Sequence, residues 1–565
     1  MTNETNFEWN GSLSALNRME RLSAMSAEPV DLLIIGGGIT GAGIALDAVS
    51  RGLRTALVEM QDYAAGTSSR STKLVHGGLR YLKQFEIGVV AEVGKERAIV
   101  YENGPHVTTP ERMLLPLYKG GTFGPLTTSL GLRVYDFLAG VKREERRRMV
   151  SAEEALRLEP LLNKDGLLGG GYYVEYRTDD ARLTIEVLKK AAELGASSVN
   201  YAGAEAFRYE GGKLVGAVIR DAIGGGAYNV RAKTIVNAAG PWVDELREMD
   251  RSKRGKTLRL TKGVHLVFDR SRFPLGQAIY FDAPDGRMVF AIPRDGKAYV
   301  GTTDTVYEGD IANPRPTAED RRYLLHAIDR MFPGLRLNEA DVESSWAGVR
   351  PLIYQEGKLP SDISRRDEIF VSPSGLLSIA GGKLTGYRKM AESVVNRVEQ
   401  RLANEGDGRP VASATKRLAI SGGDVGGSHR FEAYVQASIA EGVASGLDER
   451  ESEHLARRYG SNAAKLYAIA AGFGRAEWAS RHRLPIGLAT ELVYAISEEG
   501  VCKPEDFWVR RTGRLYFDIA YVRQWEAHIH AAMRELLAWS DAECETYRQE
   551  MQRALQEATS TPSDD

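Results

Sequence analysis

Three glycines near the amino terminus have the spacing of a site for a dinucleotide pyrophosphate. An apolar run at residues 31–35 is followed directly by the sequence GGGITG. In this G-x-G-x-x-G pattern Gly36 permits the tight turn, Gly38 lets the backbone approach the pyrophosphate, and Gly41 lets the next helix pack close to the strand. The N-terminus of that helix favours the negative charge. The sequence therefore predicts a strand, a phosphate-binding turn and a helix over residues 31–48.

An acidic residue after the next predicted strand narrows the choice of cofactor. Glu59 ends the apolar segment 53–58 and lies 23 residues after Gly36. This is close to the spacing of about 20 residues at which a carboxylate binds a ribose hydroxyl. Because the charge of Glu59 would repel a 2′-phosphate, FAD and NAD remain as candidates.

Two later segments favour FAD. Residues 234–242 predict a strand that ends in small residues, among them Gly240, which let the backbone come close to a bound cofactor. Residues 376–385 predict a strand followed by the pair Gly381 and Gly382, and a helix follows at 386–401. The N-terminus of this helix would stabilise the negative charge of a reduced flavin.

Five sequence blocks resemble FAD-dependent glycerol-3-phosphate dehydrogenases and occur in the order of that family. They are TSSRSTKLVHGGLRYL at 67–82, NAAGPW at 237–242, GTTD at 301–304, GVRPL at 348–352 and GGKLT at 381–385. The resemblance covers about residues 30–400, and residues 410–555 are similar to the helical C-terminal domain of the family. It implies an α/β fold of the glutathione-reductase type, with a Rossmann-like FAD domain, an inserted α+β substrate domain and a C-terminal helical domain.

The resemblance also implies an activity. The expected reaction is oxidation of sn-glycerol 3-phosphate to dihydroxyacetone phosphate, with FAD as hydride acceptor and membrane quinone as final acceptor. The expected location is the cytoplasm, with peripheral attachment to the inner surface of the cell membrane, and a homodimer is an open alternative to a monomer. Further cofactor contacts are implied for Thr67, Ser68, Ser69, Ser71, Lys73, Leu74, His76, Gly77, Lys383, Leu384 and Thr385. Without the resemblance, the hydroxyl-rich run would indicate only a polar loop.

Four cations in or beside the matched blocks are candidates for the substrate site. They are Arg80, Arg350, Arg366 and Lys383. A phosphate monoester carries close to two negative charges, and the arginine fork matches its oxygens. We assign Arg350, Arg366 and Lys383 to the phosphate, although the neighbouring Arg365 leaves the assignment of Arg366 ambiguous. Under this assignment Arg80 and Tyr81 would lie near the carbon skeleton and the flavin.

His265 is the candidate for the proton transfer that accompanies hydride loss. It begins an apolar strand pattern in residues 264–268, and histidine titrates in the required range. Arg350 could instead stabilise a developing alkoxide without a formal base, and a hydrogen-bonded structural histidine is the non-catalytic alternative. Thr303, at the end of a predicted strand, is assigned to the substrate oxygens or to the shape of that strand.

The elements that carry these residues divide the chain into three predicted parts. The FAD-binding domain comprises residues 28–100, 176–244 and 345–403, the substrate domain comprises 101–175 and 245–344, and the helical domain comprises 411–555. The clearest substrate-domain strands are predicted at 264–268, 288–292 and 298–301. Helices of the last part are predicted at 451–459, 463–471, 490–498 and 518–553.

The composition excludes several other classes of protein. With 74 basic and 76 acidic residues, the net charge of −2 argues against a dedicated nucleic-acid binder. Two cysteines cannot make a disulfide framework, and we expect no metal site because no metal-ligand spacing occurs. No run of 18 apolar residues predicts a spanning helix. The apolar segment 123–140 with the basic run 142–148 predicts either a core helix and loop or a membrane-surface contact.

Three other functions compete with the dehydrogenase. A glycerol-3-phosphate oxidase, which passes electrons to oxygen and makes hydrogen peroxide, would share the cofactor and substrate blocks. An amino-acid oxidase of the same fold would need one carboxylate-binding arginine rather than several cations. A non-catalytic flavin-binding protein would be indicated by loss of Arg350 or Lys383, and both are present.

Overall fold

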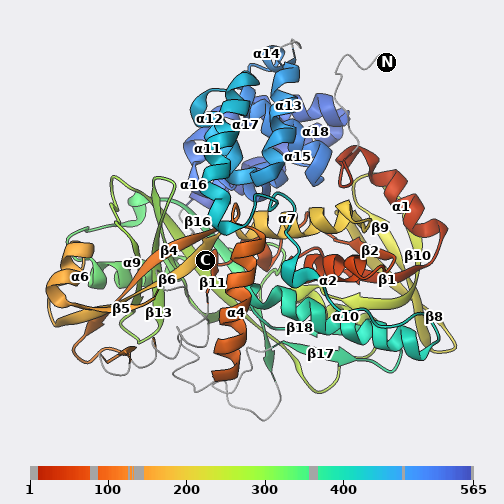
Figure 1. Ribbon diagram of the computed structural model, residues 1–565, viewed down its shortest axis with the longest axis horizontal. Coiled ribbons are helices and arrows are strands. Elements are labelled where there is room, and N and C mark those ends of the chain that lie inside the picture. Colours follow the sequence, from red (N-terminus) through yellow and green to blue (C-terminus); the bar gives the residue numbers. More distant parts are fainter. Residues whose placement is uncertain are drawn as a thin grey trace.

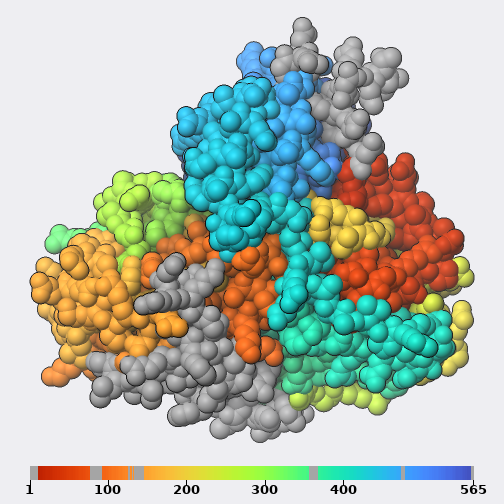
Figure 2. Space-filling view, viewed as in Figure 1, coloured from red at the N-terminus to blue at the C-terminus, as the bar shows by residue number. Residues whose placement is uncertain are grey.

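The chain folds into two β-sheets beside each other and a helical unit that stands on one side of both (Figure 1). The computed structural model describes residues 11–76, 87–124, 128–129, 132, 146–354, 367–473 and 478–560. Figure 2 shows the C-terminal helices, in blue, projecting from the body that the two sheets form.

The first sheet has the strand order β17-β18-β10-β1-β2-β7, and β9 and β8 extend it antiparallel to β10. Its strands are β1 (Val30–Ile35), β2 (Thr55–Val58), β7 (Ser197–Val199), β8 (Ala202–Glu210), β9 (Lys213–Asp221), β10 (Ala227–Asn237), β17 (Glu368–Val371) and β18 (Leu377–Ala380). Strands β18, β10, β1, β2 and β7 run parallel. The carboxyl ends of β1, β10 and β18 therefore meet at one edge, where three of the predicted cofactor segments begin.

Apolar side chains cover both faces of this sheet, as expected for buried parallel strands. On one face, Leu32 and Ile34 of β1 pack under helices α2 (Ile39–Ser50), α7 (Asp180–Glu193) and α10 (Tyr387–Asn404). On the other face, Leu33 and Ile35 join a core with helix α1 (Arg18–Ala27) and strands β8 to β10. The sheet thus holds the glycine turn after β1 between two packed layers.

The second sheet has ten strands in the order β15-β11-β14-β13-β12-β4-β6-β3, with β16 paired to β11 and β5 to β6. They are β3 (Leu74–Val75), β4 (Thr108–Tyr118), β5 (Arg148–Ser151), β6 (Leu167–Thr178), β11 (Thr257–Asp269), β12 (Ala278–Asp282), β13 (Met288–Arg294), β14 (Lys297–Gly301), β15 (Thr305–Val306) and β16 (Val342–Tyr354). Other described helices of the two-sheet body are α4 (Ile87–Asn103), α6 (Ala152–Leu158), α8 (Val243–Met249) and α9 (Ala318–Met331).

Two strands from the predicted FAD-domain segments pair into the second sheet. Strand β16 pairs with β11 along its whole length, so residues 345–354 belong to the second sheet and not to the FAD domain. Strand β3 also pairs into the second sheet, with β6, although it falls in the predicted FAD segment 28–100. Both strands carry predicted site residues. Those residues therefore lie on the second sheet, although the sequence placed their segments in the FAD domain.

The helical unit consists of helices of 4 to 19 residues around an apolar core. They are α11 (Phe431–Ala444), α12 (Glu449–Tyr459), α13 (Ala463–Phe473), α14 (Trp478–Arg481), α15 (Ile486–Glu499), α16 (Arg514–Phe517), α17 (Ile519–Leu537) and α18 (Asp541–Thr559), with a π-helical turn at Asp506–Arg511. A single helix over 518–553 is wrong: Ala538 has a left-handed φ of 53°, and Ser540 caps α18 together with Glu543.

Some of the predicted features lie outside the described residues. These include Gly77, Arg80, Tyr81 and Arg366, and most of the segment 123–148. Within the described ranges, no helix combines the length and apolar character needed to cross a membrane. No group of three or more metal-binding side chains is present in the same ranges.

Candidate functional site

A cavity of about 550 Å³ is lined by residues of both sheets. The first sheet contributes the turn after β1, Glu59 after β2, the segment after β10 and the segment after β18. The second sheet contributes residues of β12, β13 and β16, and the segment that follows β14. The cavity thus gathers the predicted cofactor segments and part of the predicted substrate site.

The glycine turn is built by close approach of backbone to backbone. Gly36 has a left-handed φ of 120°, and a Cβ on Gly41 would lie 1.9 Å from the carbonyl oxygen of Gly36. Helix α2 can therefore begin this close to β1 only with glycine at position 41. A Cβ on Gly38 would lie 3.0 Å from Oγ of Ser68, so the loop from residue 66 covers the turn.

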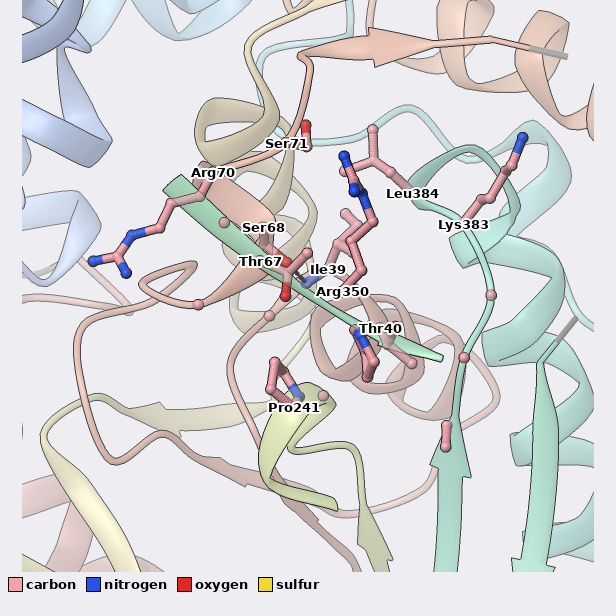
Figure 3. Close-up of a pocket in the computed structure, with 18 of the residues that line it drawn as sticks. Ile39, Thr40, Thr67, Ser68, Arg70, Ser71, Pro241, Arg350, Lys383 and Leu384 are labelled. Carbon is pink, nitrogen blue, oxygen red and sulfur yellow. Dashed lines mark hydrogen bonds between the residues drawn. The ribbon is translucent and has the colours of Figure 1, made fainter. Parts of the chain in front are cut away.

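Hydroxyl groups fix that loop against the start of α2. Oγ of Ser68 accepts a hydrogen bond of 3.0 Å from the backbone N of Ile39 (Figure 3). Oγ1 of Thr67 donates one of 2.6 Å to the carbonyl of Val349. Thr40 lies beside them at the helix start (Figure 3). The loop therefore connects the helix N-terminus to β16 of the second sheet.

Glu59 holds its own loop and the glycine turn together. Its two carboxylate oxygens accept hydrogen bonds from the backbone N of Gly37, at 2.6 Å, and of Gln61, at 2.8 Å. Burial raises the pKa of Glu59 in spite of these hydrogen bonds. The side chain lines the cavity, where it faces the position that a ribose would take beyond the turn.

The segments after β10 and β18 present backbone rather than side chains. Gly240 lines the cavity, and a Cβ placed on it would meet no other atom within 4 Å. Gly381, Gly382 and Leu384 line the opposite stretch, before α10 begins. Gly240 thus leaves room for a closely approached cofactor. At Gly382 a Cβ would instead lie 2.5 Å from Sδ of Met390 in α10, so glycine there lets the strand end and the helix pack together.

Thr385 connects the start of α10 to the end of β3. Its hydroxyl accepts a hydrogen bond of 3.2 Å from the backbone N of His76 and lies 3.3 Å from the His76 carbonyl oxygen. Burial lowers the pKa of His76 well below 6.5, and the charge of nearby Lys383 lowers it further. Its ring meets Phe290 edge-on at 5.8 Å. His76 is therefore a neutral part of the cavity wall.

Arg350 is the cation that the structure places most firmly in the cavity. Its Nη2 donates to Oγ1 of Thr302 at 3.0 Å, and its Nη1 donates to the carbonyl of Thr303 and to Oδ1 of Asp304, at 3.2 and 3.3 Å. About a third of the side chain is exposed. Figure 3 shows Arg350 and Lys383 on separate segments, with Arg70 directed away from both.

His265 lies behind the cavity wall rather than in it. Its Nε2 is 3.0 Å from Oγ1 of Thr72, which lines the cavity, and its ring stacks on Trp346 with centroids 4.7 Å apart. Only 1% of His265 is exposed. Burial lowers its pKa well below 6.5, and the charges of Arg350 and Lys73 lower it further. Direct contact between His265 and a substrate in the cavity is therefore not what this geometry provides.

Three residues of the hydroxyl-rich run are held at Asp180, the first residue of α7. Ser71 donates to the Asp180 carboxylate from its backbone N and its hydroxyl, and Nζ of Lys73 donates to the same carboxylate at 2.5 Å and to the Ser69 carbonyl at 2.9 Å. Ser71 still lines the cavity, whereas Lys73 and Ser69 do not. Lys73 and Ser69 thus hold the loop, and the cofactor contacts predicted for them stay predictions.

Several residues that line the cavity were not singled out by sequence reasoning. They are Thr72, Trp242, Tyr280, Arg287, Phe290 and Asp304. Thr72, Trp242 and Asp304 stand inside the matched blocks, so their positions carried a signal. Tyr280 and Phe290 stack at 4.2 Å across two strands, and a strand pattern alone does not tell such a pair from core residues.

Comparisons with known proteins agree with this geometry. A family model described as "FAD dependent oxidoreductase" matches residues 31–388, and one described as "C-terminal domain of alpha-glycerophosphate oxidase" matches residues 413–544. The chain is 58% identical, over 549 residues, to an aerobic glycerol-3-phosphate dehydrogenase of Bacillus subtilis (strain 168), with 97% of this chain and 99% of that protein covered. A Staphylococcus aureus (strain MRSA252) protein of the same name is 56% identical over 97% of this chain and 98% of its own length.

Solved structures show the same fold. The glycerol-3-phosphate dehydrogenase from Bacillus halodurans complexed with FAD matches with a TM-score of 0.85 and 48% identity, over 98% of this chain and 100% of that one. An L-alpha-glycerophosphate oxidase from Mycoplasma pneumoniae with FAD bound matches with a TM-score of 0.53 and 20% identity, over 67% of this chain and 95% of that one. The predicted family, fold and cofactor are confirmed. The chain belongs to the FAD-dependent oxidoreductases, in the family of the aerobic glycerol-3-phosphate dehydrogenases, and FAD is its cofactor.

Proposed function

We propose that the protein oxidises sn-glycerol 3-phosphate to dihydroxyacetone phosphate and that the electrons pass from FAD to membrane quinone. The position of Arg350 carries the proposal, since this cation lines the same cavity as the glycine cradle for FAD. The names of relatives with 56–58% identity support the substrate. In this proposal Lys383 and Arg366 complete the phosphate site, while Arg80 and Tyr81 contact the carbon skeleton.

The backbone cradle fits FAD, and this fit defines where the substrate must lie. Gly36, Gly38 and Glu59 suit the adenosine half, and Gly240, Gly381 and Gly382 line the rest of the cavity with backbone. When bound, FAD supplies a hydride acceptor for carbon 2. The substrate must then approach from the side of Thr72, Thr302 and Arg350, where the second sheet lines the cavity.

Thr72 is the side chain that we place against the hydroxyl of carbon 2. As the carbon–hydrogen bond gives up its electron pair, the hydroxyl proton passes to Oγ1 of Thr72, and the proton of Thr72 passes to Nε2 of His265. Burial and the charges of Arg350 and Lys73 lower the pKa of His265, so the ring is neutral and can accept a proton at Nε2, although the lowered pKa also makes it a weaker base. Nδ1 of His265, which has no hydrogen-bond partner among the described residues, would carry the ring hydrogen throughout.

Thr303 is better suited to shaping the strand than to binding substrate. Its hydroxyl accepts a hydrogen bond of 3.1 Å from the backbone N of Val264 and donates one of 3.4 Å to the carbonyl of Lys262. Only 2% of the residue is exposed. In our proposal Thr303 therefore fixes the adjacent Thr302 and Asp304 around Arg350.

The proposal also includes a final electron acceptor, a location and an oligomeric state. Membrane quinone, a peripheral position at the cytoplasmic face of the membrane, and a homodimer stay predictions. An oxidase that reduces oxygen is the second candidate, because the C-terminal residues 413–544 match a domain described from alpha-glycerophosphate oxidase.

Anaerobic mixing of the yellow protein with glycerol 3-phosphate tests the substrate. We expect the flavin absorbance to bleach, and its persistence at saturating substrate would exclude this substrate. The reduced protein is then mixed either with a soluble quinone analogue or with oxygen. Fast reoxidation by the quinone alone supports the dehydrogenase, whereas fast reoxidation by oxygen with hydrogen peroxide as product supports the oxidase.

A further inference from the structure

A buried carboxylate joins the cofactor loop to the C-terminal helical unit. Asp62 lies three residues after Glu59, and its side chain is completely buried. Arg511, in the π-helical turn of the helical unit, donates to both Asp62 oxygens, from Nη1 at 2.7 Å and from Nη2 at 2.8 Å. Arg510, its neighbour, donates to Asp62 through Nε and to Asp506 through Nη2 at 2.8 Å. The loop is thus bound to two cations about 450 residues away in sequence.

The charges of this cluster favour the ionised carboxylate. Burial alone would raise the pKa of Asp62, but the two guanidinium groups outweigh it and hold the pKa below its usual value. A bidentate arginine and carboxylate pair also fixes geometry, since both groups are planar and lock each other's orientation. Asn200 supplies a further hydrogen bond to Asp62, of 2.9 Å, and a second, also of 2.9 Å, to the carbonyl of Gly500 at the end of α15.

The same loop touches the glycine turn directly. A Cβ on Gly37 would lie 3.0 Å from the ring of Tyr63, and a Cβ on Gly500 would lie 3.2 Å from the other edge of that ring. Tyr63 therefore fills the space between the phosphate turn and the end of α15. Ala64 donates from its backbone N to the carbonyl of Gly37 at 3.1 Å, so that the loop closes over the turn.

The other end of this connection is Glu59. Its carboxylate accepts from the backbone N of Gly37 and of Gln61, and its carbonyl accepts from the backbone N of Ala202 at 2.6 Å. Gln61 is held in turn by Tyr201, whose backbone N donates to the Gln61 carbonyl at 2.7 Å and whose hydroxyl donates to Asp506 at 2.6 Å. A shift of Asp62 would therefore move Glu59 and the turn together.

We infer that Asp62, Arg510 and Arg511 are positioning residues for FAD, through which the C-terminal helical unit sets the affinity for the adenosine half of the cofactor. In a dinucleotide-binding fold the glycine turn and the acidic residue hold the pyrophosphate and the adenosine ribose, and Glu59 and the turn line the same cavity as Arg350 and Thr72. The inference rests on the FAD site and does not depend on which substrate is oxidised.

Binding of FAD and FMN to the full-length protein tests the inference, because FMN lacks the adenosine half. After removal of bound flavin, each is titrated and the quenching of its fluorescence is followed. We expect Asp62→Asn to raise the Kd for FAD about 10-fold and the Kd for FMN less than twofold. Equal weakening of the two flavins, or no weakening of FAD, would overturn the inference.

Glu499→Gln is the matched control. Glu499 is equally buried, lies in the same interface and pairs with Arg182 and Lys189 of α7, but its side chain does not contact the loop after Glu59. We expect less than a twofold change in either Kd. If Asp62→Asn does not fold, Arg511→Lys keeps the charge and loses the bidentate fork, and it should raise the FAD Kd about threefold with FMN unchanged. An effect of Glu499→Gln equal to that of the loop variants would also overturn the inference, as would an unchanged FAD Kd in Arg511→Lys.

Discussion

Nε2 of His265 lies 3.0 Å from Oγ1 of Thr72, and only the threonine of this pair lines the cavity. The imidazole is fixed on its other side by stacking on Trp346, whose indole N donates to the Ser71 carbonyl at 3.3 Å. Gly301 leaves the space for the ring, since a Cβ there would lie 2.1 Å from Cδ2 of His265. Any proton that His265 accepts from a substrate must therefore pass through a hydroxyl group.

Replacement of Thr72 by valine, which has the same shape but no hydroxyl, interrupts this route. We expect the rate of flavin reduction at saturating substrate to fall about 100-fold in Thr72→Val, the lower end of the range for general acid–base catalysis. Thr72→Ser keeps the hydroxyl and should stay within about threefold of the wild-type rate. Anaerobic stopped-flow bleaching measures both. An unchanged rate in Thr72→Val, across pH, would leave stabilisation of the alkoxide by Arg350 as the better account.

Loss of the Arg350 guanidinium should affect the substrate and not the cofactor. In Arg350→Met we expect kcat/KM for glycerol 3-phosphate to fall about 1000-fold, because charge-assisted hydrogen bonds in a partly dry site contribute several kcal/mol. Arg350→Lys should recover only part of the loss, since it restores the charge without the fork. FAD affinity, measured by fluorescence, should stay within twofold of the wild type. A matching loss of FAD would instead assign Arg350 to the cofactor.

The contact between Gly41 and Gly36 predicts the effect of one added methyl group. In Gly41→Ala the new Cβ would lie 1.9 Å from backbone oxygen, so α2 must shift and FAD binding should weaken at least 10-fold. Gly472→Ala is the control, because Gly472 is in helix α13 and a Cβ there meets nothing within 4 Å. That variant should bind FAD normally and gain up to about 1 kcal/mol of stability. Tight FAD binding by Gly41→Ala would contradict the role of this contact.

Histidines whose pKa is lowered by burial predict loss of stability on mild acidification. Burial lowers the pKa of His76, His106 and His265, to about 3 for His106. These rings stay neutral in the folded state, while the unfolded chain takes up protons below about pH 6.5. Stability is therefore fully present above pH 6.5 and falls as the pH drops toward the folded pKa values. Each histidine contributes up to about 1.4 kcal/mol per pH unit.

The variant His106→Gln removes one of these titrating histidines, at a position outside the candidate site. Denaturant unfolding at pH 7.0 and pH 5.5 gives the difference in unfolding free energy between the two conditions. We expect this difference to be smaller in His106→Gln than in the wild type by about 1 kcal/mol. An identical pH dependence in the two proteins would show that His106 is protonated in the folded state.

The first sheet could be predicted from the sequence because local pattern and cofactor chemistry agree there. Strand β1, which is apolar except for Asp31, has one natural place in a parallel sheet, and so do the three glycines at fixed spacing and Glu59. The break at Ala538 was missed because alanine is a strong helix former, although Ser540 and Glu543 form a capping box whose S-x-x-E pattern is present in the sequence.

The parts of the candidate site that are marked by glycine motifs could be predicted from the sequence. Side chains whose direction is set by a hydrogen bond to a distant residue were harder to predict. Ser71 and Lys73 are two residues apart in one short run. Both side chains donate hydrogen bonds to the carboxylate of Asp180, which is more than 100 residues away in sequence. Thr72, between them, faces the cavity. The pairing of β16 with β11 likewise depends on contacts distant in sequence, and no local pattern tells which of two sheets a strand will join.

The pairing of β1 with β10 has a consequence for synthesis of the chain. Val30 lies opposite Ala232, so β1 can pair early with β2 on one side but waits for more than 200 further residues before β10, its neighbour on the other side, exists. Strand β18 and the cations Arg510 and Arg511 are synthesised later still. The nascent polypeptide therefore has no complete flavin site until nearly its whole length has been made, and it depends on late-arriving partners to cover an early, strongly apolar strand.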